Sequence, residues 1–387
     1  MPRADKFANL VSSRTAAVQS AAYKPLFSKL RPQDCCPTGC TILNLCLSGR
    51  TDGGWAWGSI GHVVGDSDTG KTVIAKHTLA EASMLPDTKK IEKIDDEVEQ
   101  SSSSDLLSMF DKCADTWVAP GPDGQVSSMI EDFYGYIYKR LKAGGRFVYV
   151  LDSMDMLESK AGTELFEENI SLNEKGKDLK GSYGDGKAKQ NSTGLRKLKQ
   201  KLKHTKSLLI IVSQTRDNMN PMSMDPKTHA GGRALKFCSA YQMWLAPLKK
   251  LDKMVLGKKR DIGILTRVRV SKNHVTGAHA DFAMPFYYGY GIDDFRCSIQ
   301  WMVDNGMWKL GGGTLSFGKY AFGLDSASQE LHTFATRLRK GEQPLVDQFQ
   351  LAIQKGWDYL ENECRQSGRY SNTTNDACEL EDVSFEE

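Results

Sequence analysis

The chain has 387 residues, of which 40% are hydrophobic and 26% are charged, a composition typical of soluble globular proteins. Its formal net charge is only +3, so overall charge does not predict binding to a polyanion, and such an inference has to rest on local clusters. The first fifteen residues hold no apolar signal-peptide segment and no hydrophobic run is long enough to cross a bilayer, so we expect a cytosolic protein without a membrane anchor.

The first fifty residues predict two helices and a group of thiols. Residues 5–25 have an apolar stripe with basic ends, which fits either a helix docked on its own chain or an arm that packs on a neighbouring subunit. Four cysteines lie between residues 35 and 46, but their spacing lacks paired C-x-x-C units and no histidine follows, which favours buried thiols over a zinc site. The stretch "TGCTILNLCLSG" predicts a helix that ends at Gly49.

From residue 60 onward, apolar runs alternate with helical stretches. Strands are predicted for "IGHVVG", "KIEKIDDE", "RFVYVLDS", "SLLIIVSQT", "YQMWLAPL" and "LTRVRVSKN", and helices for a segment ending near residue 84, for 127–142 and for 193–205. Continuous apolar strands separated by helices indicate an α/β fold with a mostly parallel sheet covered on both faces. Residues 158–192 and 217–233 are long and polar, and loops of this length are usually functional or disordered.

Residues 65–72, "GDSDTGKT", fit the phosphate-loop pattern G-x-x-x-x-G-K-[ST] between a strand and a helix. Backbone N–H groups at the helix N-terminus bind phosphate oxygens, so the two aspartates are tolerable, although their charge should weaken nucleotide affinity. We expect Lys71 to reach the β- and γ-phosphates of ATP and Thr72 to bind Mg²⁺. The predicted nucleotide-binding residues of the loop are Gly65, Asp66, Ser67, Asp68, Thr69, Gly70, Lys71 and Thr72.

Three strand ends supply further candidates for ATP chemistry. Asp152 closes a buried strand, where a carboxylate is costly unless something binds it, so we predict a water-mediated contact with Mg²⁺. The segment "IDDE" ends another strand, and Glu97 is the predicted activator of the attacking water, with Asp96 as its rival. Gln214 ends a third strand and is predicted to sense the γ-phosphate and to pass the signal into residues 217–233.

A basic segment predicts DNA binding. Residues 187–206, "KAKQNSTGLRKLKQKLKHTK", contain eight Lys or Arg and no acid, a local field that attracts phosphates and predicts binding that weakens as salt rises. The alternative is a solvated basic helix face. In the second polar segment, Met219, Met222 and Met224 are suited to wedge between bases. Neither segment has a base-reading motif, which predicts sequence-independent binding.

These elements, in this order, resemble the RecA/RadA recombinase family, on its bacterial RecA and phage UvsX side. The resemblance covers residues 34–295 and includes "PTGCTILNLCLSG", "IDDE", "LRKLKQKLKHTKSLLIIVSQTR", "GGRALKF", "TRVRVSKNHVTGA" and "YYGYGI". It implies an N-terminal arm for oligomerisation (1–33), a RecA-like P-loop ATPase and DNA-binding core (34–295), a small C-terminal domain (296–370) and an acidic disordered tail (371–387).

The resemblance also implies roles for individual residues. It gives Lys71, Thr72, Asp152, Glu97 and Gln214 the ATPase roles stated above. It places Tyr288 near the nucleotide and Lys272 where it reaches ATP on the neighbouring subunit, and it puts Lys236, Phe237 and Lys272 at the subunit interface. The residues implied to contact DNA are Lys189, Ser192, Arg196, Arg216, Gly231, Gly232 and Arg233.

The function implied is an ATP- and Mg²⁺-dependent homologous recombinase. It would form a helical filament on single-stranded DNA, pair it with homologous duplex and exchange strands, with DNA-dependent ATP hydrolysis. The divergence of the sequence favours a phage origin and the cytoplasm of a bacterial host. The acidic tail either solubilises the chain, competes with DNA for the basic loops, or docks a single-strand-binding or mediator protein.

Two departures from the family pattern keep an alternative open. His274 stands where a second lysine is expected and Gln242 where an arginine is usual. Both fit a recombination mediator or regulator that binds DNA and ATP without exchanging strands. A hexameric helicase is a third interpretation, against which the basic segment and "GGRALKF" argue.

Overall fold

The computed structural model describes residues 30–99, 106, 108–175, 186–218, 227–229, 232–324 and 328–364. The predicted N-terminal helix and the acidic tail lie outside these ranges, as do Gly231 and the three methionines of the second polar segment. Within the described ranges, no helix is both long enough and apolar enough to cross a membrane.

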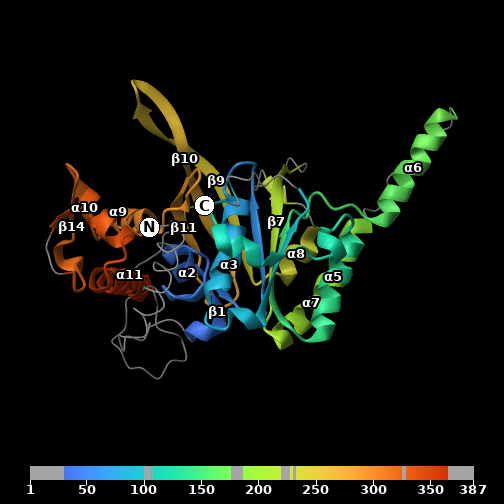
Figure 1. Cartoon of the computed structure of the whole chain (residues 1–387), viewed down its shortest axis with the longest axis horizontal. Helices are drawn as coiled ribbons and strands as arrows, with labels where there is room; N and C mark the ends of the chain where they lie inside the picture. Colours follow the sequence, from blue (N-terminus) through green and yellow to red (C-terminus); the bar gives the residue numbers. More distant parts are fainter. Residues whose placement is uncertain are drawn as a thin grey trace, which may run out of the picture.

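A ten-stranded sheet forms the centre of the molecule (Figure 1). Its strand order is β12-β11-β10-β9-β3-β7-β6-β4-β5, and β8 pairs with the end of β7. The strands are β3 (Ile60–Gly65), β4 (Ile91–Glu97), β5 (Trp117–Val118), β6 (Arg146–Asp152), β7 (Leu208–Asp217), β8 (Lys227–His229), β9 (Tyr241–Val255), β10 (Lys258–Asn273), β11 (Ala280–Tyr287) and β12 (Gly291–Ile292). All pairings from β9 through β3 to β5 are parallel, whereas β9 to β12 pair antiparallel.

Helices cover both faces of the sheet because the central strands are apolar on both sides. Alternate residues of β6 and β7 point to opposite faces, so Val148 and Ile210 join one buried cluster and Tyr149 and Ile211 the other. The first cluster includes α2 (Thr41–Ser48) and α3 (Lys71–Met84), and the second includes α5 (Ile130–Ala143), α7 (Gly186–Thr205) and α8 (Gly232–Cys238). The predicted α/β class with a mostly parallel sheet is confirmed. The four clustered cysteines are buried free thiols.

The described residues of the polar segment 158–192 are largely helical, which corrects the expectation of a long irregular loop. Helix α6 (Lys160–Glu174) begins at Ser159, whose hydroxyl accepts a hydrogen bond from the Gly162 N–H at 3.1 Å, and it projects from the body of the molecule (Figure 1). It buries none of its side chains, and its Phe166 and Ile170 are exposed, so its apolar residues do not pack against the sheet. Helix α7 then begins at Gly186, seven residues before the predicted start.

The strands predicted near residues 241 and 265 form one antiparallel hairpin. With 15 and 16 residues, β9 and β10 are much longer than the apolar runs that predicted them. The outer half of this hairpin leaves the sheet and extends into solvent (Figure 1). Its residues are mostly charged, so hydrophobic alternation marks only the inner half, which is packed in the core.

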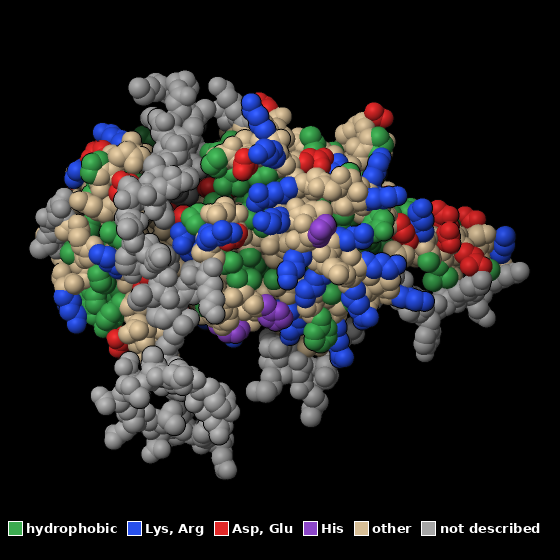
Figure 2. Space-filling model, turned by 90° about the horizontal axis from the view of Figure 1, so that it is seen from below, with side chains coloured by type: hydrophobic (Ala, Val, Ile, Leu, Met, Phe, Trp, Pro, Cys, Tyr) green, Lys and Arg blue, Asp and Glu red, His purple; other side chains and the backbone are tan. Residues whose placement is uncertain are grey.

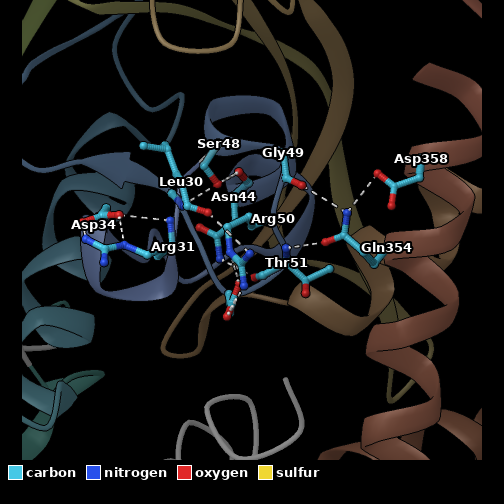
Figure 3. Close-up of polar contacts among 12 residues, drawn as sticks. Leu30, Arg31, Asp34, Asn44, Ser48, Gly49, Arg50, Thr51, Gln354 and Asp358 are labelled. Carbon is cyan, nitrogen blue, oxygen red and sulfur yellow. Dashed lines mark hydrogen bonds and ion pairs between the residues drawn. The ribbon is translucent and has the colours of Figure 1, made fainter. Parts of the chain in front are cut away.

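The C-terminal part packs against α2 through one continuous apolar cluster. It contains α9 (Asp294–Asp304), α10 (Leu331–Arg339), α11 (Gln343–Cys364) and a small sheet of β13 (Lys309–Gly311), β14 (Thr314–Ser316) and β15 (Ser328–Glu330). Polar bonds fix α11 to the end of α2 (Figure 3): the Gln354 side chain accepts the Thr51 N–H at 3.0 Å and donates to the Gly49 carbonyl at 3.1 Å. Gly49 ends α2 in the left-handed conformation, as predicted.

Short elements complete the described chain. Beside α2, β1 (Cys35–Cys36) pairs with β2 (Trp55–Ala56) in a two-stranded sheet. The short 3₁₀ segments are Pro32–Asp34, Thr88–Lys90, Asp111–Thr116, Pro122–Gly124 and Gly318–Tyr320.

Candidate nucleotide-binding site and DNA-facing surface

The phosphate loop connects the end of β3 to the start of α3 at the carboxyl edge of the parallel strands. Gly70 has φ +89°, and a Cβ there would lie 2.6 Å from the Phe286 ring, so only glycine fits this turn. The Thr69 hydroxyl donates to the Asp66 carbonyl at 2.8 Å, and the Lys71 ammonium donates to the same carbonyl at 2.5 Å. Short bonds within the loop therefore hold the predicted cradle in place, with Ser67 and Asp68 exposed at its tip.

Lys71 lies in a low-dielectric position surrounded by carboxylates. Its side chain is buried, and this burial lowers the pKa of its ammonium group, while the charges of Asp152, Glu99, Asp66 and Asp155 act in the opposite direction. An ammonium group so placed gains stability from any further anion that enters the site. This is the environment that a phosphate-binding lysine requires.

Thr72 and Asp152 meet where a metal ion would be held. The Thr72 hydroxyl donates to Asp152 Oδ2 at 2.6 Å, and the carboxyl group is buried. Burial raises the pKa of Asp152 to about 6, although the Thr72 hydrogen bond opposes this rise. A hydroxyl and a carboxylate, which are hard oxygen ligands, fit Mg²⁺ bound together with substrate phosphates. A divalent cation would also stabilise the ionised form of this buried group.

The acidic residues at the end of β4 point to opposite faces of the sheet. On the α3 side, the fully buried Lys76 pairs with both Asp95 and Glu97, with 3.0 Å between its Nζ and Glu97 Oε2. On the other side, the carboxylate of Asp96 accepts bonds from the Ser127 N–H at 2.7 Å and from the hydroxyls of Ser127 and Tyr149, each at 2.6 Å. Asp96, the predicted rival of Glu97, is completely buried. Its carboxylate accepts these three hydrogen bonds within the core, which is a structural role.

Glu99, which sequence reasoning did not select, lies beside the other predicted site residues. Its Oε1 accepts the Ser153 hydroxyl at 2.5 Å and the Gln214 side-chain amide at 3.3 Å. Gln214 is not at the end of a strand as predicted, because β7 continues to Asp217 and pairs with β8. The only sequence signal for Glu99 is its position two residues beyond Glu97.

Asp66 connects the phosphate loop to the second polar segment. Its carboxylate accepts a hydrogen bond from the Thr215 hydroxyl and forms an ion pair with Lys227. The hydrogen bond from Lys227 and that from Thr215 lower the pKa of Asp66. Thr215 lies in β7 and Lys227 in β8, on either side of residues 219–226. This contact gives Asp66 a role, whereas the sequence alone showed only that an aspartate there is compatible with a phosphate loop.

The predicted DNA-contacting residues of the first segment lie on helix α7 rather than in a loop. Leu195, Leu198 and Leu202 are buried, whereas Lys189 and Arg196 are exposed, and Arg196 donates to the Ser192 hydroxyl at 3.0 Å. Lys and Arg side chains gather on the lower face of the molecule, between its C-terminal part and the projecting α6 (Figure 2).

Helix α7 runs from one edge of the sheet to the other. Asn191 donates to Met154 Sδ just beyond the carboxyl end of β6, at 3.7 Å. At the other end, Lys203 lies against Gly58, just before the start of β3. The first half of α7, which carries Lys189, Ser192 and Arg196, therefore lies at the same edge as the phosphate loop.

The remaining predicted residues are mostly exposed. Arg216 follows Thr215 on β7 and pairs with Asp155 at 3.5 Å, and Gly232 and Arg233 begin α8. Lys236 and Phe237 are exposed further along α8, with the Phe237 ring 72% exposed, and Lys272 donates to the carbonyl groups of both residues.

Two other positions bear on the predicted interface. Tyr288, in the turn from β11 to β12, is 65% exposed. Gln242 is instead buried and pairs with His62 Nδ1 at 3.1 Å, so it serves the core rather than a surface.

Comparison with known proteins finds similar sequences among RecA proteins. The RecA N-terminal domain family matches residues 151–293. Protein RecA of Saccharopolyspora erythraea is 27% identical over 286 residues, covering 73% of each chain. Protein RecA of Clostridium acetobutylicum is 26% identical over 303 residues, covering 77% of each chain. Among solved structures, a RadB recombinase aligns with a TM-score of 0.45 and 16% identity, covering 66% of this chain and 98% of the other.

The family match includes β7 and the basic helix α7. The RecA matches support a role in DNA recombination, with binding of ATP and DNA. In sequence, the chain is similar to RecA recombinases.

Proposed function

We propose that the protein is an ATP-dependent homologous recombinase that forms helical filaments on single-stranded DNA and catalyses homologous pairing and strand exchange. The observation that carries the proposal is the direct link from the phosphate loop to the flanks of the second DNA-binding segment through Asp66, Thr215 and Lys227. A nucleotide in this loop would alter the field at Asp66 and thereby the position of β8. ATP binding and DNA binding are then coupled by contact.

The ATPase site follows from the residues at the carboxyl edge of the sheet. Lys71 would bind the β- and γ-phosphates, and Thr72 and Asp152 would hold Mg²⁺, which neutralises charge that develops on the phosphates. Gln214 would sense the γ-phosphate from within β7. Glu97, which ends β4, would activate the attacking water.

Single-stranded DNA would follow the carboxyl edge from α7 to α8. The first half of α7 offers Lys189, Ser192 and Arg196, and the second segment offers Arg216, Gly232 and Arg233. The cations of the second half of α7 lie toward the opposite edge. We expect Lys189→Gln/Arg196→Gln to weaken DNA binding about tenfold or more, and Lys201→Gln/Lys203→Gln, which removes the same charge from the same helix, to have a much smaller effect. Equal losses in a salt titration would contradict this path.

The β9–β10 hairpin offers a second phosphate-binding surface. Residues directly opposite on paired strands share a face, and so do alternate residues along a strand. In the register of the hairpin, Lys253 is opposite Arg260 and Val255 is opposite Lys258. One face of this hairpin, all of whose residues are described, therefore carries four cations and no carboxylate. We call it the cationic face, and its charged members are Lys249, Lys253, Lys258 and Arg260.

The opposite face of the hairpin is neutral by comparison. There Lys250 pairs with Asp261 at 2.7 Å and Lys259 pairs with Asp252 at 2.6 Å. The segregation of unpaired cations on one face supports contact with duplex DNA, because a duplex presents about one phosphate per 1.7 Å of its axis. Leu256 at the tip is 97% exposed.

Filament assembly is supported by an exposed group on α8 and β10. The Phe237 ring is largely in solvent beside exposed Lys236, and Lys272 is held next to both by the carbonyl groups of α8. An exposed aromatic ring among cations is typical of an interface anchor. In a filament, Lys272 would approach ATP bound on the adjacent subunit.

The test is joint-molecule formation between single-stranded DNA and homologous supercoiled duplex, with ATP and Mg²⁺. We expect joint molecules with the unaltered protein and none with Lys71→Ala, together with helical filaments in electron micrographs. Full ATP-dependent strand exchange by Lys71→Ala would contradict the mechanism. DNA binding without joint molecules would favour the mediator, and closed rings would favour a helicase.

A further inference from the structure

We propose that the tip of the β9–β10 hairpin is an apolar wedge, which inserts Leu256 between stacked base pairs of a DNA duplex while the cationic face holds the phosphates. The inference rests on the proposed function, because it deepens the duplex contact of that face. It assigns a separate action, local unstacking of the duplex, to a side chain that belongs neither to the ATPase site nor to the second polar segment.

The tip combines exposed apolar side chains with a turn that does not suit leucine. Met254, Val255 and Leu256 follow one another and are 64%, 37% and 97% exposed. Val255 pairs with Lys258, so Leu256 and Gly257 form a two-residue loop between the strands. Both loop residues have positive φ, +51° for Leu256 and +72° for Gly257. A type I′ turn requires these signs, and asparagine or aspartate is the residue that usually precedes its glycine.

Leu256 therefore contributes little to the stability of the fold. Leucine is disfavoured in the left-handed region, because its Cβ crowds the following carbonyl oxygen. A side chain that is 97% exposed also gains almost nothing from burial in its own chain. Its apolar surface is available to a ligand instead. An exposed apolar cluster bordered by polar residues is typical of an interaction site.

The charges next to the tip favour a polyanion as the ligand. Val255 lies on the cationic face, where Lys258 is opposite it and Lys253 is two residues away on the same strand. The row of cations thus continues to the apolar tip, with no carboxylate on this face of the fully described hairpin. DNA phosphates carry the matching charge. Several proteins that bend DNA likewise combine cations that contact it with apolar side chains inserted between its bases.

The distances along the hairpin fit a duplex. Strand residues advance about 3.4 Å each, so Leu256 lies roughly 10 Å beyond Lys253 along the strand. The grooves of B-form DNA are about 7.5–8.5 Å deep. When Lys253 and Arg260 bind phosphates at the rim of a groove, Leu256 would reach the base pairs at its floor. An apolar side chain inserted there unstacks the adjacent base pairs and kinks the duplex.

The extent of the cationic face argues against a lipid surface as the ligand. Lys249 is also part of this face, and it lies roughly 20 Å or more from Leu256 along the strand. A loop that places its tip in the apolar part of a bilayer brings only the cations beside the tip to the headgroups. A duplex that lies along the hairpin contacts the whole row.

The experiment compares Leu256→Asn with Leu256→Met in the full chain. Each protein is bound, without nucleotide, to short duplexes that carry 2-aminopurine, a base whose fluorescence rises when it is unstacked. Asn-Gly is a preferred pair for this turn, so Leu256→Asn should melt at the same temperature as the unaltered protein or at a higher one. We expect this variant to reduce the fluorescence rise at saturating protein about threefold or more, with an unchanged salt dependence of duplex binding. Leu256→Met keeps an apolar side chain and should retain most of the rise.

Each outcome decides for or against the wedge. An equal fluorescence rise with Leu256→Asn and with the unaltered protein would overturn it, also where Leu256 proves necessary for binding phosphatidylserine vesicles or for self-association in sedimentation. A duplex affinity that does not respond to Lys253→Gln/Arg260→Gln would refute the contact of the cationic face, and the wedge with it. Unstacking that depends on Leu256, in a protein that forms no joint molecules, would refute strand exchange while supporting the wedge.

Discussion

Replacing Asp152 with asparagine should stabilise the free protein while it removes metal-dependent nucleotide binding. The carboxyl group is buried at the end of β6 and accepts the Thr72 hydroxyl at 2.6 Å. Asparagine has nearly the same shape and keeps an oxygen to accept that bond, but it carries no charge. The substitution therefore removes mainly the unfavourable burial of an ionised group.

The magnitude follows from the shift in pKa. Burial raises the pKa of Asp152 from 3.8 to about 6, a difference that corresponds to about 3 kcal/mol between the protonated and ionised forms. A raised carboxyl pKa favours folding when the group is protonated, so this stability is present at acid pH and is lost as the pH rises from about 4 to about 6. The gain from Asp152→Asn should be about 1 kcal/mol at pH 4.5 and about 3 kcal/mol at pH 7.

The assay is thermal unfolding without nucleotide at several pH values, with a parallel series in ATP and Mg²⁺. We expect the melting temperature of Asp152→Asn to exceed that of the unaltered protein by about 5 °C or more at pH 7. Only the unaltered protein should gain stability from ATP with Mg²⁺. Asp155→Asn is the matched control, because Asp155 accepts the Gln214 N–H at 2.7 Å and pairs with Arg216, so its loss should not stabilise. A variant no more stable than the unaltered protein, or a gain independent of pH, would refute the reasoning.

Two further predictions concern the phosphate loop and the hairpin. Asp66→Asn should reduce the ATP-induced gain in single-stranded DNA affinity about threefold or more, because it breaks the contact with Lys227. Asp68→Asn, at an exposed position of the same loop, should leave this gain unchanged. Equal effects of the two variants in fluorescence anisotropy would count against the coupling. Lys253→Gln/Arg260→Gln on the cationic face should reduce the slope of log affinity for duplex DNA against log salt by about 2. Lys250→Gln/Lys259→Gln removes the same charge from the other face and should change this slope little. Identical slopes for the two double variants would contradict a face-specific contact.

The parallel core was predictable because its signals are local and strong. The runs "IGHVVG", "RFVYVLDS" and "SLLIIVSQT" are buried on both faces of the sheet, so each reads as a strand without reference to its neighbours. Helix α5, which buries the stripe Ile130, Phe133, Ile137 and Leu141, was found from its periodicity. Helix α3 was found because the phosphate loop opens it. Helix α6 and the outer half of the hairpin bury little, so no continuous buried run of the kind seen in the core strands marks them.

The candidate site was predictable only where the residue type is dictated by chemistry. A phosphate loop needs its glycines, lysine and threonine at fixed spacing, and a buried strand that ends in aspartate signals a ligand. Asp66 could not be interpreted, because its partners Thr215 and Lys227 are about 150 residues away in sequence. Sequence position also placed Gln214 at a strand end, whereas pairing with β8 extends the strand by three residues.

The choice among the carboxylates after β4 shows how one buried side chain can change the reading of a motif. In "IDDEVE" the alternation of a strand sends Asp95 and Glu97 to the α3 side and Asp96 to the other. Sequence reasoning places all three acids at a strand end near the phosphates and favours Glu97, with Asp96 as its rival. Lys76 lies one helical turn beyond Thr72, so α3 presents both the candidate metal ligand and this ammonium group to the same side of the sheet. The lysine that follows the phosphate loop thus pairs with Glu97, a contact that the strand pattern alone does not reveal.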